Sequence, residues 1–320
     1  MKFTKKIKIN LYIYIKTIIN IIKNKKFIIF FKFLIFILFS FAKKKKYIKV
    51  ALCTMAKKEN LYIEEFIKHY IKLGLDQIFI YDDNDVNTER IKDKVNPLNK
   101  KYITIYENIK TKIKNQGEAF TECYNNHKDK YDWFLMVDID EFLIINHDTL
   151  KNYLLKNKLK KCDFIKFHWL IPTDNNLLYY NNKSLFERFK GPYIKSVFIK
   201  SIIRGNINNL KYWVHSPSSS PIKNITCNNV GEIVNYPKFN SEIITKINIK
   251  NAYFIHFKYK STEEYINKYK RGYSNWLGSQ INQHLYGKIE EYLRDNKITK
   301  EKIDYFEKEL KLNLTKFKLN

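Results

Sequence analysis

The stretch from Trp133 to Phe142 constrains the fold and the chemistry of this chain more than any other. It reads WFLMVDIDEF, so five apolar residues run directly into Asp-x-Asp-Glu. A short apolar run of this kind is typical of a buried central strand, and open α/β sheets bind ligands where such strands end. Because side chains along a strand alternate between its faces, we expect Asp138 and Asp140 to point the same way. Two such carboxylates predict a site for a hard divalent cation, which would in turn hold a diphosphate.

A simpler interpretation of this motif stays open. Asp-x-Asp is a short and common pattern, and acidic residues at strand ends are often only solvated. The buried run before the motif and the Glu141-Phe142 pair after it favour the metal site.

The charge of the chain is unevenly distributed. Residues 1–50 hold 14 lysines and no acidic residue, so removing them from a net charge of +27 leaves +13 on the other 270 residues. The sequence shows no helix-turn-helix, zinc-finger or Arg-rich motif, so we expect no nucleic-acid partner, although a basic nucleic-acid-binding protein is the alternative. A mildly basic remainder suits an anionic nucleotide or a membrane surface.

The N-terminal segment combines an apolar run with lysine clusters. Residues 27–42 read FIIFFKFLIFILFSFA, with lysines on both sides. This run is shorter than the roughly 20 residues that a spanning helix needs, and no small-residue cleavage site follows it. We therefore expect residues 1–46 to anchor the chain at a membrane surface, with the lysines on anionic headgroups. A single-pass anchor and a buried helix are the alternatives.

Four cysteines are spread widely along the chain, without a CxxC pair. This spacing argues against a zinc site. Cys53 and Cys123 lie within apolar patterns, so we expect buried thiols and a reducing compartment, with disulfides as the alternative.

Alternating strands and helices predict a mostly parallel sheet. We expect strands over residues 47–54, 75–81, 102–106 and 131–137, and helices over residues 59–73 and 116–127. Gly74 is placed to end the first helix as a left-handed cap. Beyond residue 150 we expect a helix over 148–159, strands over 164–170, 193–203 and 249–257, a loop over 216–220 and charged helices over 261–320. The expected parts are therefore an anchoring segment (1–46), an α/β domain (47–260) and a helical extension (261–320).

Four blocks of sequence together span about residues 48–275. They are KENLYIEEF from residue 58 with LG and IFIYDDN after it, QGEAFTECY from residue 116, WFLMVDIDEF from residue 133, and HFKYKSTEEY from residue 256, which continues to Lys270-Arg271-Gly272. In order, spacing and residue type these blocks resemble glycosyltransferase family 92 and related bacterial enzymes of the GT-A, family 2-like type. The family usually has Asn-Glu where this chain has Glu59-Asn60, and residues 143–250 match only loosely.

The resemblance implies a Rossmann-like, GT-A type α/β fold with a mostly parallel mixed sheet flanked by helices. It also implies a nucleotide-diphosphate-sugar donor, which we expect to be a UDP-sugar, and Mn²⁺ or Mg²⁺. Asp138 and Asp140 fall on the metal and sugar-nucleotide motif of the family, and Glu141 is placed to hold the loop or touch the donor sugar. His256, at the end of a strand-like run, is a candidate third metal ligand or a packed histidine.

Further candidates follow the first two strands. Asp82 and Asp83 end the second strand, where an acidic residue binds the base or ribose in related folds; alternatively, they cap their own turn. Thr54, Lys57 and Glu59 lie at the end of the first strand and are candidates for contacts with the nucleotide.

Other candidates lie later in the chain. Lys270 and Arg271 are placed to reach phosphate or to form a solvated helix face. His215 lies in an aromatic, Pro-bounded loop and is a candidate for donor or acceptor contact. An inverting reaction needs a carboxylate base, for which Asp174 and Glu187 are the candidates. Asp140 and Glu141 are the other residues that we expect to be catalytic.

We therefore expect a membrane-associated, metal-dependent glycosyltransferase of the hexosyltransferase type. It would move a sugar from a nucleotide-diphosphate donor to a glycan or a lipid-linked glycan acceptor. A phosphotransferase or nuclease that uses the same aspartate pair is a further alternative. The expected location is the cytoplasmic face of a bacterial membrane, with a Golgi-type single-pass arrangement as the alternative.

Overall fold

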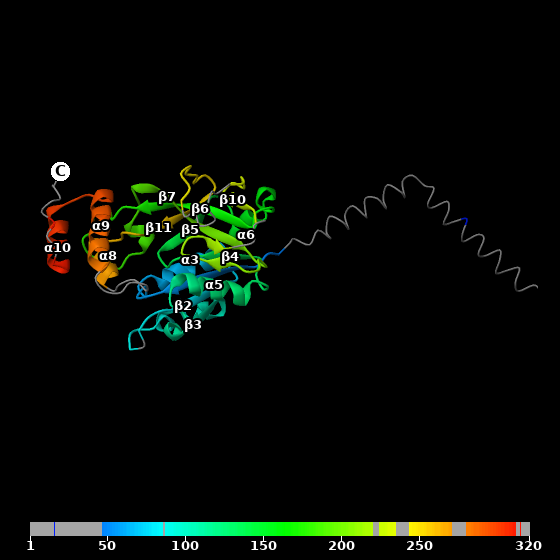
Figure 1. The fold of residues 1–320 in the computed structure, drawn as a ribbon, viewed down its shortest axis with the longest axis horizontal. Helices are drawn as coiled ribbons and strands as arrows, with labels where there is room; N and C mark the ends of the chain where they lie inside the picture. The colour runs from blue at the N-terminus through cyan, green and yellow to red at the C-terminus, as the bar shows by residue number, and fades with distance from the viewer. Residues whose placement is uncertain are drawn as a thin grey trace, which may run out of the picture. The chain divides into compact units, whose positions relative to one another are not determined.

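The computed structural model describes residues 47–85, 87–219, 224–234, 243–270 and 280–311, together with Lys16 and Leu314. The chain divides between Tyr47 and Ile48, and the unit that begins at Ile48 contains the sheet and the C-terminal helices (Figure 1). The expected anchor over residues 1–46 lies outside the described residues, apart from Lys16. In the described part of the chain, no helix is both long enough and apolar enough to cross a bilayer.

Four parallel strands form one half of a nine-stranded mixed sheet. They lie in the order β3-β2-β1-β4, with bounds Ile103–Tyr106, Gln77–Asp82, Val50–Ala56 and Trp133–Met136. Chain order runs outward from β1 in both directions, with β2 on one side and β4 on the other. Open α/β sheets bind ligands at the carboxyl ends beside such a switch point, and the Asp138 segment follows β4 there.

The other half of the sheet is mixed. The strand β7 (Tyr193–Arg204) pairs antiparallel with both β4 and β6 (Phe164–Pro172), and β11 (Ala252–His256) runs parallel to β6. The strand β5 (Glu141–Ile145) pairs antiparallel with β11, with His256 opposite Glu141. This register places the end of β11 directly beside the Asp138–Glu141 turn. The remaining strands are β10 (Thr226–Asn228), which pairs with β6, and the hairpin of β8 (Lys211–Tyr212) and β9 (Pro217–Ser219).

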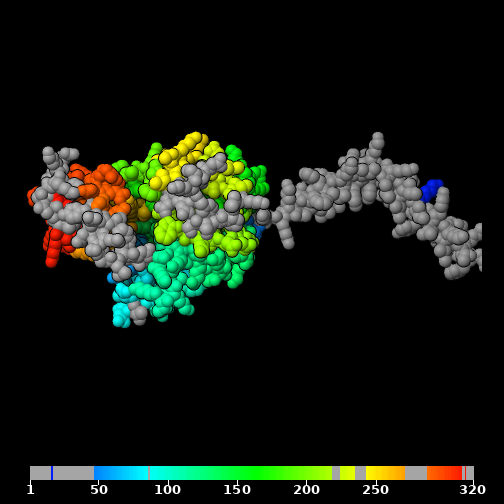
Figure 2. Space-filling view, viewed as in Figure 1, coloured from blue at the N-terminus to red at the C-terminus, as the bar shows by residue number. Residues whose placement is uncertain are grey.

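Some of the helices pack on the sheet, and the last three lie together at one end of the unit. The helix α3 ends at Gly74, whose φ of 95° is the left-handed conformation that glycine adopts at little cost. Figure 1 shows α8, α9 and α10 grouped at one end of the unit, and Figure 2 shows them in orange and red on its surface. The helices are α3 (Ile63–Leu73), α4 (Ile91–Lys94), α5 (Gln116–His127), α6 (Leu150–Leu154), α7 (Leu185–Arg188), α8 (Thr262–Lys270), α9 (Gln280–Asp295) and α10 (Lys300–Leu310), with short 3-10 helices η1 (Pro97–Tyr102), η2 (Ile109–Thr111) and η3 (Asn157–Leu159).

Two apolar clusters lie on the two faces of the sheet. Alternate residues of β1 separate between them: Val50 and Leu52 belong to the cluster that includes α3, whereas Ala51 and Cys53 belong to the cluster that includes α5. All four are fully buried, as expected for a central strand covered on both faces. The strand β1 is therefore packed on both faces next to the edge of the sheet where the acidic motif lies.

The predicted α/β class, with a mostly parallel mixed sheet, flanking helices and a helical C-terminal extension, is confirmed. The bounds of α5 are those predicted, and the early strands differ from the predictions by a few residues. The expected loop over residues 216–220 is wrong in part, because Pro217–Ser219 pairs with β8. The predicted helix over residues 148–159 is interrupted, since α6 ends at Leu154 and η3 follows it.

The expectation of buried thiols is wrong. Disulfides join Cys53 to Cys123 and Cys162 to Cys227, and the described residues include no free cysteine. The first pair meets because α5 packs on the face of β1 that carries Cys53, although 70 residues separate the two cysteines. This disulfide links α5, which begins at Gln116, to the central strand β1.

Candidate active site

The acidic motif forms a turn between β4 and β5. The backbone N–H of Glu141 donates to the carbonyl of Asp138 (3.0 Å), and the backbone N–H of Asp138 donates to the Glu141 carboxylate (3.1 Å). The expectation that Asp138 and Asp140 point the same way from one strand is therefore wrong. The strand β4 ends at Met136, and the turn directs the two carboxylates to different partners.

Asp138 is the most accessible carboxylate of the turn. Its side chain keeps 27% of its exposure, whereas those of Asp140 and Glu141 keep 4% and 0%. The carboxylate accepts hydrogen bonds from the Gln116 amide and from the Lys200 amine, which lies 3.2 Å away. A ligand that approaches the turn from solvent therefore meets Asp138 first.

Asp140 is buried among cationic and imidazole groups. Its carboxylate lies 2.9 Å from the amine of Lys268, 3.5 Å from that of Lys260 and 3.5 Å from the Nε2 atom of His256. Burial opposes ionisation, but the charges of Lys268 and Lys260 prevail and hold the pKa of Asp140 well below its usual range. Asp140 is therefore ionised and orients the three groups around it.

A buried lysine links the turn to a neighbouring loop. The Lys200 amine contacts the carboxylates of Asp138 (3.2 Å) and Glu141 (3.4 Å) and donates to the carbonyl of Val214 (2.8 Å). Burial alone would lower the pKa of Lys200, but the two carboxylates raise it, so the amine stays charged. The Ser201 hydroxyl donates to the carbonyl of His215 (3.1 Å), which docks the same loop on β7.

Gly117 allows this loop to approach the start of α5. A Cβ atom at this position would lie 2.9 Å from the carbonyl oxygen of Tyr212 and 3.4 Å from the indole of Trp213. A larger residue would therefore push the loop away from Gln116 and from Asp138.

The predicted metal ligands do not converge into one closed site. Among the residues that the structure describes, no group of three or more His, Cys, Asp or Glu side chains is close enough to hold a metal ion. His256 contacts Asp140, whereas Asp138 contacts Gln116 and Lys200. The accessible carboxylate of Asp138 nevertheless fits a hard cation of the Mg²⁺ type, which takes one or two carboxylates and completes its shell with water and substrate phosphates. The metal therefore stays a prediction, with Asp138 as the residue best placed to hold it.

His256 is kept neutral. Burial lowers the pKa of His256 well below its ordinary value, and the charge of Asp140 only partly opposes this effect. Its Nδ1 atom is buried and has no hydrogen-bond partner among the described residues.

The candidates at the ends of β1 and β2 divide into two groups. Asp82 closes its own loop, because it accepts from the backbone of Asn84 (3.0 Å) and Ile91 (3.1 Å) and lies 3.2 Å from Arg90. Asp83 is buried, and its Oδ2 atom lies 4.0 Å from Lys57 without a hydrogen-bond partner in the described part of the chain. Asp83 and Lys57 are therefore better placed than Asp82 to meet a nucleotide.

Thr54 and Glu59 lie at the same edge. The Thr54 hydroxyl is fully buried and has no hydrogen-bond partner among the described groups. Glu59 is connected to the acidic turn through Lys260, whose amine lies 3.8 Å from Glu59 and 3.5 Å from Asp140.

Two expected bases serve the framework instead. Asp174 accepts from the Tyr292 hydroxyl (2.5 Å) and pairs with Lys302 (2.5 Å), which fastens the C-terminal helices. Glu187 forms a capping box with Ser184 at the start of α7. Both carboxylates therefore have structural contacts away from the acidic turn, and we do not propose either as the catalytic base.

Of the two expected phosphate contacts, Lys270 alone lies in the described part of the chain. Lys270 forms an ion pair with Glu309 of α10, which matches the alternative of a solvated helix face. Arg271 lies outside the described residues.

Several residues that contact the acidic turn were not predicted from the sequence. Gln116, Lys200, Lys260 and Lys268 all approach it from other elements. Lys200 alone could have been noticed in the sequence, because a charged residue interrupts the apolar run of β7 there. The others looked like ordinary polar residues of helices and loops.

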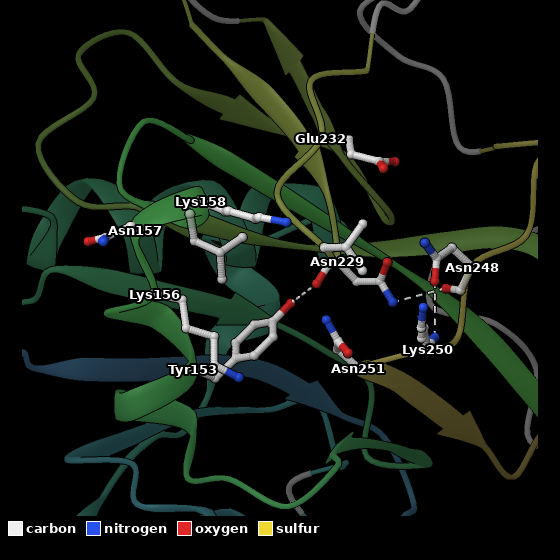
Figure 3. A pocket seen from close by; sticks show the side chains of 11 residues that line it. Tyr153, Lys156, Asn157, Lys158, Asn229, Glu232, Asn248, Lys250 and Asn251 are labelled. Atoms are coloured by element: carbon white, nitrogen blue, oxygen red, sulfur yellow. Dashed lines mark hydrogen bonds between the residues drawn. The ribbon is translucent and has the colours of Figure 1, made fainter.

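A separate polar pocket of about 600 Å³ lies elsewhere in the unit (Figure 3). Its lining residues include Tyr153, Lys158, Asn229 and Lys250. The side-chain amide of Asn229 also donates to the carbonyl of Ala252 (2.7 Å). Ala252 begins β11, whereas the acidic turn lies beside the end of that strand. None of the candidate site residues lines this pocket.

Comparison with known proteins identifies a family. The family model described as glycosyltransferase family 92 matches residues 46–314. A glycosyltransferase family 92 protein of Oryza sativa subsp. japonica is 25% identical over 121 residues, which are 36% of this chain and 20% of that protein. A second, from Arabidopsis thaliana, is 27% identical over 112 residues, covering 35% of this chain and 19% of that protein. The matched segments therefore span about a fifth of the length of these relatives.

One solved structure shows a slight similarity. Mannosyl-3-phosphoglycerate synthase from Rubrobacter xylanophilus aligns with a TM-score of 0.28 and 14% identity, over 38% of this chain and 40% of that one. A similarity of this size carries no argument about function.

Proposed function

This chain belongs to glycosyltransferase family 92, and we propose that it transfers a sugar from a nucleotide-diphosphate donor to a glycan acceptor. The proposal places the reaction at the Asp138–Glu141 turn. This turn follows β4 at the switch point of the sheet, where open α/β folds bind their ligands.

The observation that carries the proposal is the cationic lining of this acidic turn. The amines of Lys200, Lys260 and Lys268 lie between 2.9 and 3.5 Å from the carboxylates of Asp138 or Asp140. A diphosphate leaving group gains negative charge as the bond to the sugar breaks, and cations that are already in position stabilise this charge. Lys268 keeps 21% of its side-chain exposure, so it is the amine most able to reach the diphosphate.

The finer proposal concerns the metal and the donor. We propose that Asp138 holds Mn²⁺ or Mg²⁺ together with the diphosphate, and that Asp140 orients Lys260, Lys268 and His256. A bound divalent cation would supply Lewis-acid stabilisation of the departing phosphate oxygens. Asp83 and Lys57, at the ends of β2 and β1, are the residues proposed to face the nucleoside, and UDP is the proposed nucleotide.

The location is also a proposal. We keep the sequence-based inference that residues 1–46 attach the domain to a membrane, near a glycan or lipid-linked glycan acceptor. The two disulfides favour an oxidising compartment, since such bonds rarely persist in a reducing cytosol. We therefore prefer the Golgi-type alternative to the cytoplasmic face of a bacterial membrane.

A donor screen tests the proposed reaction. The full-length protein in lipid nanodiscs is incubated with UDP-galactose, UDP-glucose, UDP-N-acetylglucosamine or GDP-mannose. Release of the nucleoside diphosphate, with water accepting the sugar in place of the glycan, is measured with Mn²⁺ and with EDTA. We expect release from one UDP-sugar that falls at least ~100-fold in EDTA, because a metal contributes several kcal/mol of charge stabilisation. Hydrolysis of bis(p-nitrophenyl) phosphate without release of a nucleoside diphosphate would instead indicate a phosphodiesterase.

A further inference from the structure

An aromatic cluster lies directly beside the acidic turn, centred on Trp169. The Trp169 ring centroid is 4.5 Å from that of His256, 5.1 Å from that of His215 and 5.8 Å from that of Phe198. The pairing of β6 with β7 shifts register opposite Trp169. His168 pairs with Ile199 but Leu170 pairs with Lys195, so the extra residues, Phe198 among them, belong to β7. Bulges of this kind redirect a side chain and are frequent beside active sites.

Two buried polar atoms of this cluster lack partners. Trp169 is 5% exposed and His256 is 8% exposed, and neither Nε1 of Trp169 nor Nδ1 of His256 has a hydrogen-bond partner among the described residues. Buried indole and imidazole nitrogens are normally paired, because an unpaired polar atom costs free energy. A ligand that carries hydroxyl groups would supply the missing partners.

Two large aromatic side chains, one on β7 and one on the loop that carries His215, are exposed. Phe198 keeps 37% of its surface and Trp213 keeps 49%. Trp213 belongs to the loop that also carries His215, and Lys200 and Ser201 of β7 dock this loop beside Asp138. The exposed rings are therefore held in place by the same contacts that organise the acidic turn.

The strand order separates this cluster from the nucleotide side. In the sequence β2-β1-β4-β7-β6-β11, Asp83 and Lys57 follow β2 and β1, whereas Phe198, Trp169 and His256 lie on β7, β6 and β11. The turn after β4 lies between the two groups. A donor whose nucleoside faces β1 and β2 and whose diphosphate meets Asp138 would direct the reacting carbon of its sugar toward the aromatic side. An acceptor that attacks this carbon would therefore approach over the aromatic cluster.

We propose that Trp169, Phe198 and Trp213 form the acceptor subsite, and that they bind a neutral sugar ring of the acceptor glycan. The exposed rings offer apolar faces against which the C–H face of a sugar packs. The indole N–H of Trp169 donates to a sugar hydroxyl, and Nδ1 of His256 exchanges a hydrogen bond with another. This inference rests on the proposed function, because it assumes a donor at Asp138.

The test uses Phe198→Ala and Trp213→Ala in the full-length protein in lipid nanodiscs, with UDP and Mn²⁺ present. The probes are methyl β-galactoside, methyl β-glucoside, methyl α-mannoside and N-acetylglucosamine, and their contact is measured by saturation-transfer difference NMR. Calorimetry measures UDP affinity in the same samples. Tyr179→Ala is the matched control, because Tyr179 is an exposed aromatic (56%) that packs on Tyr305 of α10.

We expect at least one glycoside to contact the wild-type protein, and its affinity to fall about tenfold in both cluster variants. UDP affinity should stay within about twofold, and Tyr179→Ala should behave as wild type. If UDP binds but no glycoside does, or if both cluster variants keep the glycoside, the acceptor subsite is wrong and the proposed function stands. A parallel loss of UDP affinity in these variants would assign the cluster to the nucleotide and overturn the inference. Absence of UDP binding by the wild type would contradict the proposed function itself.

Discussion

Asp138→Asn is expected to lower sugar transfer by ~100-fold or more while the protein remains folded. Asp138 is the accessible carboxylate of the turn, so the substitution removes the charge that would meet the metal and diphosphate. The side-chain oxygen of asparagine can still accept from Gln116 or Lys200, and the position is partly exposed, so little stability should be lost. Release of the nucleoside diphosphate measures the activity, and the midpoint of thermal unfolding checks the fold.

Asp129→Asn is the matched control for this substitution. Asp129 keeps 71% of its side-chain exposure and pairs only with its neighbour Lys128 among the contacts described. Activity within about twofold of wild type is expected, since isolated surface ion pairs contribute little. Full activity of Asp138→Asn would contradict the role assigned to Asp138.

Arg188→Leu is expected to reduce the free energy of unfolding by about 3–5 kcal/mol. The Arg188 guanidinium makes two hydrogen bonds to the Glu264 carboxylate (2.6 and 3.0 Å), and the hydroxyls of Tyr62 and Ser261 donate to the same carboxylate. Both members of the ion pair are almost fully buried. Loss of the arginine would leave the charge of Glu264 without its partner, which is the costly case.

A double variant separates charge from packing in this result. Arg188→Leu/Glu264→Leu removes both charges, so it should recover part of the stability lost by the single variant, as measured by urea denaturation. Arg294→Leu, at an arginine with 70% of its side chain exposed, should change stability by less than ~0.5 kcal/mol. Equal losses in the single and double variants would show that an uncompensated charge is not the cause.

The buried network of Arg188 also supports the active site. Ser261 follows Lys260, whose φ of 57° is a left-handed conformation that is uncommon for lysine. The Lys260 amine lies 4.4 Å from the centre of the Tyr62 ring and 3.5 Å from Asp140. Glu264 therefore contacts Ser261, which follows Lys260 in the chain, and Tyr62, whose ring lies against the Lys260 amine. Because Arg188 holds Glu264, variants at Arg188 should impair activity as well as stability.

The parts of the fold that depend on local pattern could be predicted from the sequence. The apolar runs of β1, β2 and β4 and the helical spacing before Gly74 each reflect a periodicity that the chain carries within about ten residues. The run before Asp138 marked the edge of the sheet where the site lies. Errors in these elements were confined mostly to their ends, where capping and pairing compete.

The surroundings of Asp138 and Asp140 could not be predicted in this way. Strand alternation does not apply to them because a turn begins after Met136. Lys200 and Lys268 reach the turn from positions 62 and 128 residues away, and no local pattern encodes such meetings. The disulfide between Cys53 and Cys123 could not be predicted for the same reason, since 70 residues separate the two cysteines.

The roles of Asp174 and Glu187 were also beyond the sequence. Both are acidic residues in polar segments, which suits a catalytic base and a structural contact equally well. Only the packing of Asp174 against Tyr292 and Lys302, and the cap that Glu187 forms with Ser184, distinguishes the two uses.

Calorimetric titration of UDP into the full-length protein measures whether the acidic turn binds a nucleotide through a metal. Titrations are run with Mn²⁺ and with EDTA, for the wild type and for Asp138→Asn. We expect saturable binding with Mn²⁺ that is lost in EDTA and in the variant, because a metal held by Asp138 would bind the diphosphate. Equal UDP binding with EDTA would contradict the metal role, and a folded wild-type protein that binds neither UDP, GDP nor CMP would contradict a nucleotide-sugar site at this turn.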